Sequence, residues 1–405
     1  MNIKTAGGGH TGLALFALSM GGFAIGTTEF GTMGLVPYFS QGLHIGIERA
    51  GQVISAYALG VVVGAPILAV ATARLARRTV LIGLMLFFAA GNLLSALAPD
   101  FGWMMAFRFI AGLPHGAYFG VAGLVAAGLV SPAKRTQAIA SVLIGLTIAT
   151  ILGVPLANEI GQVFNWRWAF ALVGLLAAAT AGLVYALVPP REDALHARDP
   201  LAELHALGNH RVWLTLGIGA VGFGGIFAIY TYLASTLLQV TGAPPYMQPV
   251  VLAIFGLGMT LGNLLAARFA DKALLPTIAG VLVWGAASMA LYPFMTAHVW
   301  SMAVAAFLIG SAGGLGSPLQ AQLMRVAGKA QTLAAALNHS AMNTANALGP
   351  ALAGLAIGAG CSLPSIGWVG CALALGGLGF WGAAVAAERA VPFGGEASRR
   401  SAARD

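Results

Sequence analysis

The stretch Gly21-Gly-Phe-Ala-Ile-Gly-Thr-Thr-Glu-Phe-Gly-Thr-Met-Gly-Leu-Val-Pro37 places a carboxylate, Glu29, inside the first long apolar segment of the chain. An ionisable side chain at membrane depth costs about 2.5 to 3.5 kcal/mol on insertion scales, so it is rarely kept without a partner or a function. We therefore interpret Glu29 as a candidate functional group. The alternative is a structural carboxyl, either neutral or salt-bridged between helices.

The composition around this stretch is that of an integral membrane protein. Of the 405 residues, 59% are hydrophobic and 8% are charged, against about 25% charged residues in an ordinary soluble domain. Apolar runs of about 20 residues, the length that spans a bilayer core, recur along the chain. They predict an all-α membrane protein with twelve transmembrane helices, at 13–37, 50–71, 79–98, 103–130, 137–160, 168–188, 212–238, 248–267, 275–296, 301–323, 332–358 and 367–387.

The basic residues predict the topology. All but three of the 20 Lys and Arg fall on one side of this map; Arg49 and Arg167 fall on the other side, and Arg108 lies within a helix. By the positive-inside rule both termini are cytoplasmic, and we expect a multi-pass protein of a bacterial cytoplasmic membrane. The net charge of +8 is therefore explained by topology, and no nucleic-acid partner is expected.

The helices divide six and six around one polar interruption. We predict an N-terminal bundle over 1–188, a cytoplasmic linker over 189–211, a C-terminal bundle over 212–388 and a cytoplasmic tail over 389–405. Glycine pairs recur at an offset of 198, which indicates a duplicated, pseudo-symmetric architecture. The alternative is a general background of close helix packing at small residues. The recurring glycines are Gly60 with Gly258, Gly64 with Gly262, Gly112 with Gly310 and Gly116 with Gly314.

The fourth predicted helix supplies candidate partners for Glu29. Arg108, Gly112 and His115 lie on one face at i, i+4 and i+7. By depth, Glu29 falls between Arg108 and His115, so we expect an Arg108–Glu29 ion pair. His115, with an unperturbed pKa near 6.5, is a candidate proton relay or substrate ligand. The alternatives are that Arg108 extends to the membrane interface and that His115 is a packing residue.

Two further helices carry polar or aromatic faces. His339, Asn343 and Asn346 follow i, i+4 and i+7 in the eleventh predicted helix, and either join helices by hydrogen bonds or face a cavity. For the two asparagines we favour the first role. Tyr230, in the seventh helix, either lines a cavity or packs.

The motifs of common enzymes and ATP-driven pumps are absent from the sequence. It has no GxxxxGK[ST] phosphate loop, no HExxH zinc motif and no GxSxG nucleophile turn. The two cysteines, Cys361 and Cys371, have neither metal-ligand nor redox spacing. We expect no enzymatic activity, no cofactor and no metal, so the energy for any active transport must come from a gradient.

Several motifs together resemble the major facilitator superfamily, and within it the drug-proton-antiporter-like bacterial permeases labelled arabinose efflux permeases. The resemblance covers nearly the whole chain. It is carried by Gly26-Thr-Thr-Glu-Phe30 with Gly34-Leu-Val-Pro37, Gly64-Ala-Pro66, Arg108 through Gly120, Gly153-Val-Pro-Leu156 with Trp166-Arg-Trp-Ala-Phe170, and Gly258 through Gly262. It implies two six-helix bundles around a central site.

The resemblance also implies residue roles. Arg108 corresponds to the helix-4 arginine linked to proton coupling, and Gly145, Gly153 and Pro155 to the kinked helix-5 seam of exporters. Arg74, Arg77 and Arg78 match the cytoplasmic gate signature after helix 2, but Ala73 replaces its usual aspartate. The second-half copy retains an acid in Asp271, beside Lys272, so we expect the gate to depend on Asp271.

The function expected from the resemblance is proton-coupled export of a small molecule such as a sugar, a nucleoside or a drug like chloramphenicol. The expected partners are that substrate, protons and the lipid bilayer, and the expected state is a monomer. The alternatives are a uniporter or proton symporter that imports a sugar or nucleoside, and a membrane sensor or scaffold without transport activity.

Overall fold

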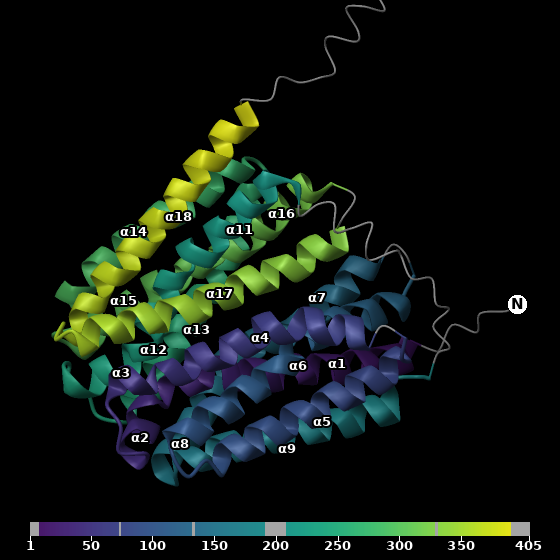
Figure 1. Cartoon of the computed structure of the whole chain (residues 1–405), viewed down its shortest axis with the longest axis horizontal. Coiled ribbons are helices and arrows are strands. Elements are labelled where there is room, and N and C mark those ends of the chain that lie inside the picture. Colours follow the sequence, from purple (N-terminus) through teal and green to yellow (C-terminus); the bar gives the residue numbers. More distant parts are fainter. Residues whose placement is uncertain (1–7, 73, 132–133, 191–207, 329–330, 390–405) are drawn as a thin grey trace, which may run out of the picture.

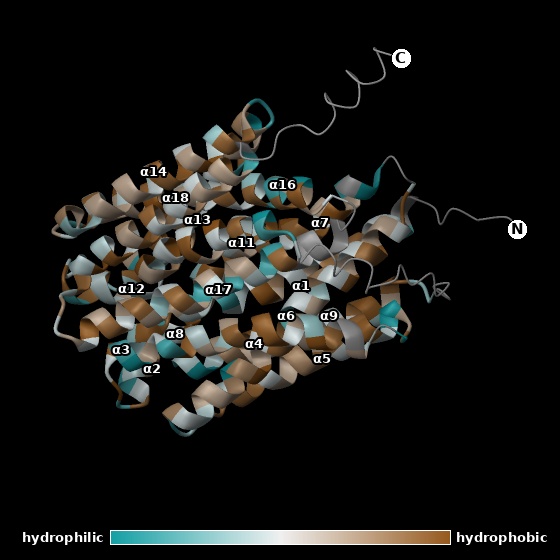
Figure 2. Ribbon diagram, turned by 45° about the horizontal axis from the view of Figure 1, so that its top comes forward, coloured by the Kyte–Doolittle hydropathy of each residue, from teal (hydrophilic) through white to brown (hydrophobic). Residues whose placement is uncertain are grey.

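The computed structural model describes residues 8–72, 74–131, 134–190, 208–328 and 331–389, and in these ranges all regular secondary structure is helical. The helices run side by side in two bundles (Figure 1). Eleven helical segments are long and apolar enough to cross a membrane, and α17 (Gln331–Gly358) matches the remaining predicted run. The predicted fold class is therefore confirmed. Hydrophobic residues cover most of the ribbon, with hydrophilic positions on α16 and α17 (Figure 2).

The first bundle contains the helices before the predicted linker. Its elements are α1 (Gly8–Gly34), α2 (Val36–Gly42), α3 (Ile47–Ala50), α4 (Gln52–Ala71), α5 (Arg77–Ala96), α6 (Phe101–Gly128), α7 (Arg135–Ile148), the π-helix η2 (Ala149–Gly153), α8 (Val154–Val163) and α9 (Trp166–Leu187). The predicted linker, 189–211, lies mostly outside the described residues.

The second bundle contains the remaining helices, and the predicted tail beyond Arg389 lies outside the described residues. The elements are α11 (His210–Gly222), α12 (Gly224–Gln239), α13 (Met247–Ala270), α14 (Leu274–Met295), α15 (Val299–Ser311), the 3-10 turn η4 (Ala312–Leu315), α16 (Gly316–Ala327), α17, the 3-10 turn η5 (Leu363–Ser365) and α18 (Ile366–Arg389).

Three predicted single helices are interrupted in the structure. The run 137–160 contains the π-helix η2, the run 212–238 breaks between α11 and α12, and the run 301–323 contains η4. Glycines surround the last two breaks, and glycine is a poor helix former because it loses the most backbone freedom. Hydropathy changes little from α7 to α8 and from α11 to α12, so it did not reveal these two breaks, whereas it falls from α15 to α16 across η4.

Polar residues cap helices at both ends of the bundles. The side chains of Asp100 and Asn165 accept hydrogen bonds from the backbone N–H groups of Trp103 and Arg167, at the starts of α6 and α9. Asn209 caps α11 in the same way. Each cap satisfies a backbone donor that has no partner within its helix.

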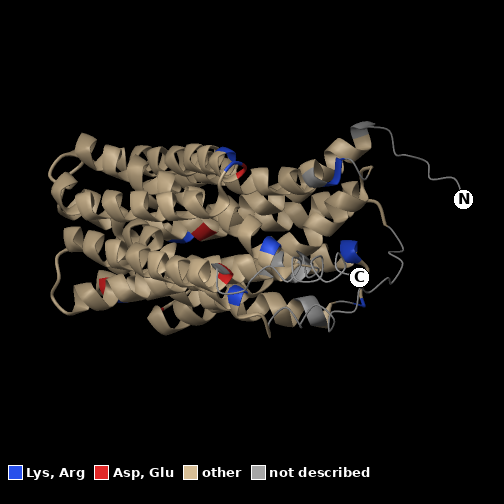
Figure 3. Cartoon of the chain, turned by 90° about the horizontal axis from the view of Figure 1, so that it is seen from above, with Lys and Arg blue, Asp and Glu red and all other residues tan. Residues whose placement is uncertain are grey.

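The two ends of the bundles differ in chemistry. We call the end that carries Arg74, Arg77, Lys134 and Arg268 the basic end; most of the Lys and Arg visible in Figure 3 lie in the half nearer the N-terminus. We call the opposite end the far end. Four of the helices that start there, α6, α9, α15 and α18, each carry an exposed tryptophan in their first three residues, namely Trp103, Trp168, Trp300 and Trp368. Such a belt is typical of a membrane interface.

The glycine pairs pack as the duplication predicts. A Cβ atom on Gly60 would collide with the carbonyl oxygen of Phe109, and one on Gly258 with that of Phe307, so that both members of the contact are shifted by the same 198 residues. Similarly, a Cβ atom on Gly112 would collide with the carbonyl oxygen of Tyr57, and one on Gly310 with that of Phe255. The seam between α4 and α6 therefore recurs between α13 and the α15–η4 segment.

We predict that Gly112→Ala destabilises the protein by about 1 to 3 kcal/mol, because the added methyl group meets backbone atoms that cannot move independently. Gly120→Ala is the matched control on the same helix, since nothing lies within 4 Å of the position that its Cβ atom would take. It is expected to be neutral or slightly stabilising. Thermal unfolding in detergent measures both, and equal melting temperatures for the two variants would contradict the close contact.

Candidate functional site

Glu29 lies between the two bundles. Its side chain is buried in the second half of α1, and its Oε1 accepts a hydrogen bond of 3.2 Å from Nδ2 of Asn346 on α17. From Gly21 onward every residue of α1 except Phe23 is buried, because this helix packs against its own bundle and against α12. The only carboxylate of α1 is thus held by the opposite bundle.

His115 approaches Glu29 from within the first bundle. Its Nε2 lies 4.0 Å from Oε2 of Glu29, and its Nδ1 lies 3.0 Å from the hydroxyl of Tyr57, with which it forms a hydrogen bond. When Tyr57 donates this bond, the proton of a neutral imidazole is on Nε2, the nitrogen that faces Glu29. This separation is longer than a hydrogen bond, so proton exchange between the imidazole and the carboxyl would need a closer approach or a bridging water.

Arg108 does not form the predicted ion pair with Glu29. Its Nη1 donates to Oγ1 of Thr28 at 3.2 Å and to Oδ1 of Asn92 at 3.1 Å. Successive residues of a helix point about 100° apart, so Thr28 faces Arg108 while Glu29 faces the opposite bundle. Depth alone, which motivated the prediction, does not specify this rotation.

The surroundings of Arg108 also exclude the alternative that it extends to the membrane interface. The side chain is 1% exposed, and its guanidinium lies 4.3 Å from the ring centroid of Tyr57 and 5.2 Å from that of Phe170. Cation–π contacts of this kind stabilise a desolvated guanidinium. Arg108 is therefore a buried cation held by neutral groups, one of which is the residue next to Glu29.

The face of α17 that carries His339, Asn343 and Asn346 meets the first bundle at two of these positions. The ring of His339 stacks on that of Phe119, with centroids 5.8 Å apart and planes 4° apart. Asn346 reaches Glu29, whereas Asn343 donates to the carbonyl oxygen of His339 within its own helix. The side-chain oxygens of both asparagines are buried without a partner.

Tyr230 belongs to an aromatic wall beside Glu29. Its ring lies 4.2 Å from that of Phe255 and 6.1 Å from that of Phe30, the residue after Glu29. Phe227 stacks on Phe30 as well, at 6.4 Å. Tyr230 is buried and packs against Phe255, and the site combines the carboxyl of Glu29 and the imidazole of His115 with buried aromatic rings.

The residues of the proposed exporter seam bring α1 close to α7, η2 and α8. A Cβ atom on Gly145 would collide with the carbonyl oxygen of Ser19, and one on Gly153 with the side chain of Thr27. Pro155 lies in the first turn of α8, where its missing N–H is tolerated, directly after the π-helix. π-helical turns often mark functional positions, and this one lies beside α1, the helix that carries Glu29.

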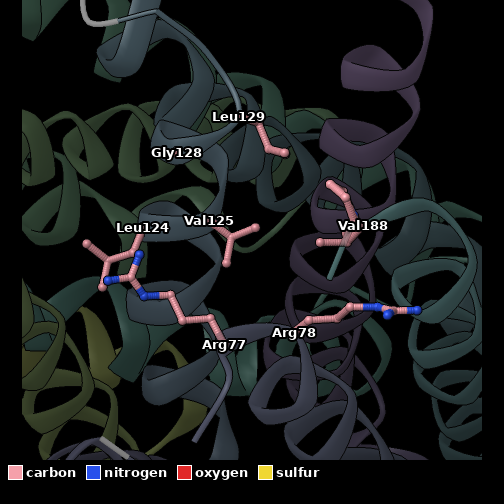
Figure 4. Close-up of a pocket in the computed structure, with 8 residues that line it drawn as sticks. Arg77, Arg78, Leu124, Val125, Gly128, Leu129 and Val188 are labelled. Carbon is pink, nitrogen blue, oxygen red and sulfur yellow. The ribbon is translucent and has the colours of Figure 1, made fainter. Parts of the chain in front are cut away.

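The candidate gate arginines lie at the basic end. Arg74 is exposed, whereas Arg77 and Arg78 line a small pocket with Val125 and Val188 between α5, α6 and α9. Figure 4 shows that their guanidinium groups point away from each other. That of Arg78 donates to the carbonyl oxygen of Tyr185 and lies 5.0 Å from its ring centroid.

Asp271, on which the gate is expected to depend, lies at the basic end. Asp271 and Lys272 are exposed at the end of α13, and within the described residues neither forms an ion pair. Instead Glu388 on α18 binds Arg325 on α16 at 2.7 Å and accepts a hydrogen bond of 2.8 Å from Gln322. The gate role of Asp271 therefore stays a prediction.

Sequence reasoning missed the carboxamides that support the site. Asn92 links Thr28 to Arg108, and Gln248 on α13 donates to the carbonyl oxygen of Gly34 and to Oδ1 of Asn158. Each is an isolated amide within an apolar run, and this isolation is the feature of the sequence from which these residues could have been identified. Within the described ranges, no cluster of three or more His, Cys, Asp or Glu residues is placed to hold a metal ion.

Comparison with known proteins agrees with this architecture. The family model of the Major Facilitator Superfamily matches residues 18–350. The chain is 38% identical over 366 residues to the inner membrane transport protein YdhP of Escherichia coli, covering 89% of this chain and 94% of YdhP. It is 32% identical to the chloramphenicol resistance protein of Streptomyces lividans, covering 85% and 89% of the two chains.

Solved structures show the same fold at low sequence identity. A variant of the nucleoside transporter NupG superimposes with a TM-score of 0.73 at 13% identity, covering 91% of this chain and 98% of that one. A bacterial homologue of the human lysosomal transporter Spinster superimposes with a TM-score of 0.66 at 17% identity, covering 94% of both chains. From the family match and the identities above, the chain is a multi-pass membrane protein that belongs to the major facilitator superfamily.

Proposed function

We propose that this protein is a proton-coupled exporter of a small organic molecule, which works by alternating access between its two bundles. The observation that carries the proposal is the position of Glu29, a buried carboxyl approached by His115 from its own bundle and by Asn346 from the other. A group held by both bundles changes its surroundings when they move apart. Its protonation is therefore coupled to that movement.

The proposed orientation places the basic end in the cytoplasm, by the positive-inside rule. In this orientation the far end faces the outside of the cell. Glu29, Arg108 and His115 all belong to the first bundle. We propose that the protein acts as a monomer in a bacterial inner membrane, with the proton gradient as its energy source and without a cofactor.

The similarity to a chloramphenicol resistance protein supports export and makes phenicol-type drugs the first substrates to test. The aromatic wall formed by Phe30, Phe227 and Tyr230 is compatible with such a ligand. Sugars and nucleosides are the other candidates. A thermal-shift screen across these three classes identifies a ligand, because one that binds only the native state raises the unfolding temperature.

Uptake into inside-out vesicles tests the direction and the coupling. We expect the substrate found in the screen to accumulate when the vesicle interior is acidic, and to stop accumulating when an ionophore collapses the gradient. Accumulation that ignores an imposed proton gradient would exclude antiport. Accumulation with the opposite gradient would favour the importing alternative, and an absence of flux in proteoliposomes for every ligand that binds would favour a sensor or scaffold.

A further inference from the structure

Gln248 joins the two bundles at the far end. It is the second residue of α13, its side chain is 0% exposed, and it makes three hydrogen bonds to the first bundle. Its Nε2 donates to the carbonyl oxygen of Gly34 at 2.6 Å and to Oδ1 of Asn158 at 3.0 Å. Its Oε1 accepts from the hydroxyl of Tyr38 at 2.6 Å. Both amide hydrogens and one acceptor position are therefore used across the interface.

The backbone around Gln248 is shaped for this contact. A Cβ atom on Gly34 would collide with Oδ1 of Asn158 and with Leu252, the residue one turn after Gln248. One further turn along, Gly256 packs closely on the carbonyl group of Thr150 in the π-helix. The positions i, i+4 and i+8 of α13 thus form one continuous stripe against α1, η2 and α8.

Most of the side-chain hydrogen bonds between described residues of the two bundles belong to this cluster. The side-chain hydrogen bonds that join described residues of the two bundles involve Glu29 with Asn346, Ser55 with the carbonyl oxygen of Ala347, and the Gln248 cluster. None of them lies near the basic end. Three of the five meet on Gln248, at the end of α13 that lies farthest from the basic end.

The cluster has no copy in the duplicated architecture. At the offset of 198, Gln248 corresponds to Ala50 and Asn158 to Ala356, neither of which carries a polar side chain. The equivalent seam between α4 and the second bundle therefore lacks these bonds. The asymmetry indicates that Gln248 performs a task that symmetric helix packing does not require.

We propose that Gln248 is the latch of the far end, a residue whose hydrogen bonds to Tyr38, Gly34 and Asn158 must break before this end opens. The proposal rests on alternating access, as proposed above. Breaking these buried hydrogen bonds costs free energy unless water reaches the freed groups, so they hold the far end closed while the cluster stays dry. The closed state is stabilised without charged residues, which would be costly to bury.

The test measures opening directly and independently of transport. Cys361 is exposed and Cys371 is partly exposed, so both are first replaced by Ser and Ala. The reporter is Leu252→Cys, because Leu252 is 1% exposed and lies beneath the latch. A membrane-impermeant maleimide added to right-side-out vesicles reports how often the far end opens. In the parent the label is expected to react slowly.

Gln248→Leu is expected to raise the labelling rate by about tenfold or more, because it removes all three bonds at similar volume. Asn158→Ala and Tyr38→Phe each remove one of the three bonds to Gln248 and are expected to give smaller increases. These two variants also carry the test if Gln248→Leu fails to fold. Gln52→Leu, which changes an exposed glutamine at the same end, is the matched control and is expected to leave the rate unchanged.

An unchanged labelling rate in folded Gln248→Leu, Asn158→Ala and Tyr38→Phe overturns the latch. If Gln248 instead contacts substrate, Gln248→Leu raises KM while the labelling rate stays at the parent value, which also overturns it. If labelling increases but no proton-driven flux is found in any variant or in the parent, the latch stands and the proposed export function fails. The two proposals are thus separated by one set of variants.

Discussion

Glu29→Gln is expected to abolish proton-driven transport while leaving substrate binding intact. Glutamine retains the size of the side chain and still accepts the hydrogen bond from Asn346, but it cannot bind and release a proton at neutral pH. We expect gradient-driven accumulation in inside-out vesicles to fall by about 100-fold or more, the scale found when a positioned proton-transfer group is removed. The variant should also lose its response to an imposed pH difference.

The matched control is Glu159→Gln, which changes an exposed carboxylate within the first bundle. It should transport like the parent. Substrate exchange without a proton gradient separates coupling from binding: Glu29→Gln should retain exchange, because alternating access itself is unaffected. Full proton-driven accumulation by Glu29→Gln would reassign Glu29 to a structural contact and make His115 the remaining candidate for proton coupling.

Arg108→Ala is expected to reduce stability more than any other substitution at the site. It empties the volume between the rings of Tyr57 and Phe170 and removes the donor to Thr28 and Asn92. Emptying the site of a large buried side chain costs about 3 to 5 kcal/mol. We expect a decrease in melting temperature of roughly 4 to 6 °C for a chain of this length, measured by thermal unfolding in detergent.

Arg108→Lys distinguishes the charge from the geometry of the guanidinium. Lysine preserves the cation but lacks the planar group that stacks on Tyr57 while donating to two acceptors, so we expect an intermediate loss of stability. Arg268→Ala, at an exposed position of α13, is the control and should leave the melting temperature within about 1 °C of the parent. An Arg108→Ala protein that melts at the temperature of the parent would contradict this prediction.

Much of the site was accessible to sequence reasoning, because burying a charge in a membrane is costly and the few buried polar residues stand out. Glu29, Arg108, His115 and His339 were identified in this way, and the side chains of all four contact residues in the interior of the protein. The predicted Arg108–Glu29 ion pair was wrong, because it depended on how α1 is rotated about its own axis. Asn346, expected to join helices, does so by bonding to the carboxyl itself.

The number of apolar spans, the duplicated glycine pattern and the candidate polar residues were predictable from the sequence, because each depends on local hydrophobicity or on spacing along one chain. Which polar groups meet was not predictable in this way: His115 and Asn346 approach Glu29, Thr28 and Asn92 bind Arg108, and Gln248 binds the far end of the first bundle. These contacts join residues up to 317 positions apart. They follow from how two bundles rotate and dock, which no periodicity within a single helix records.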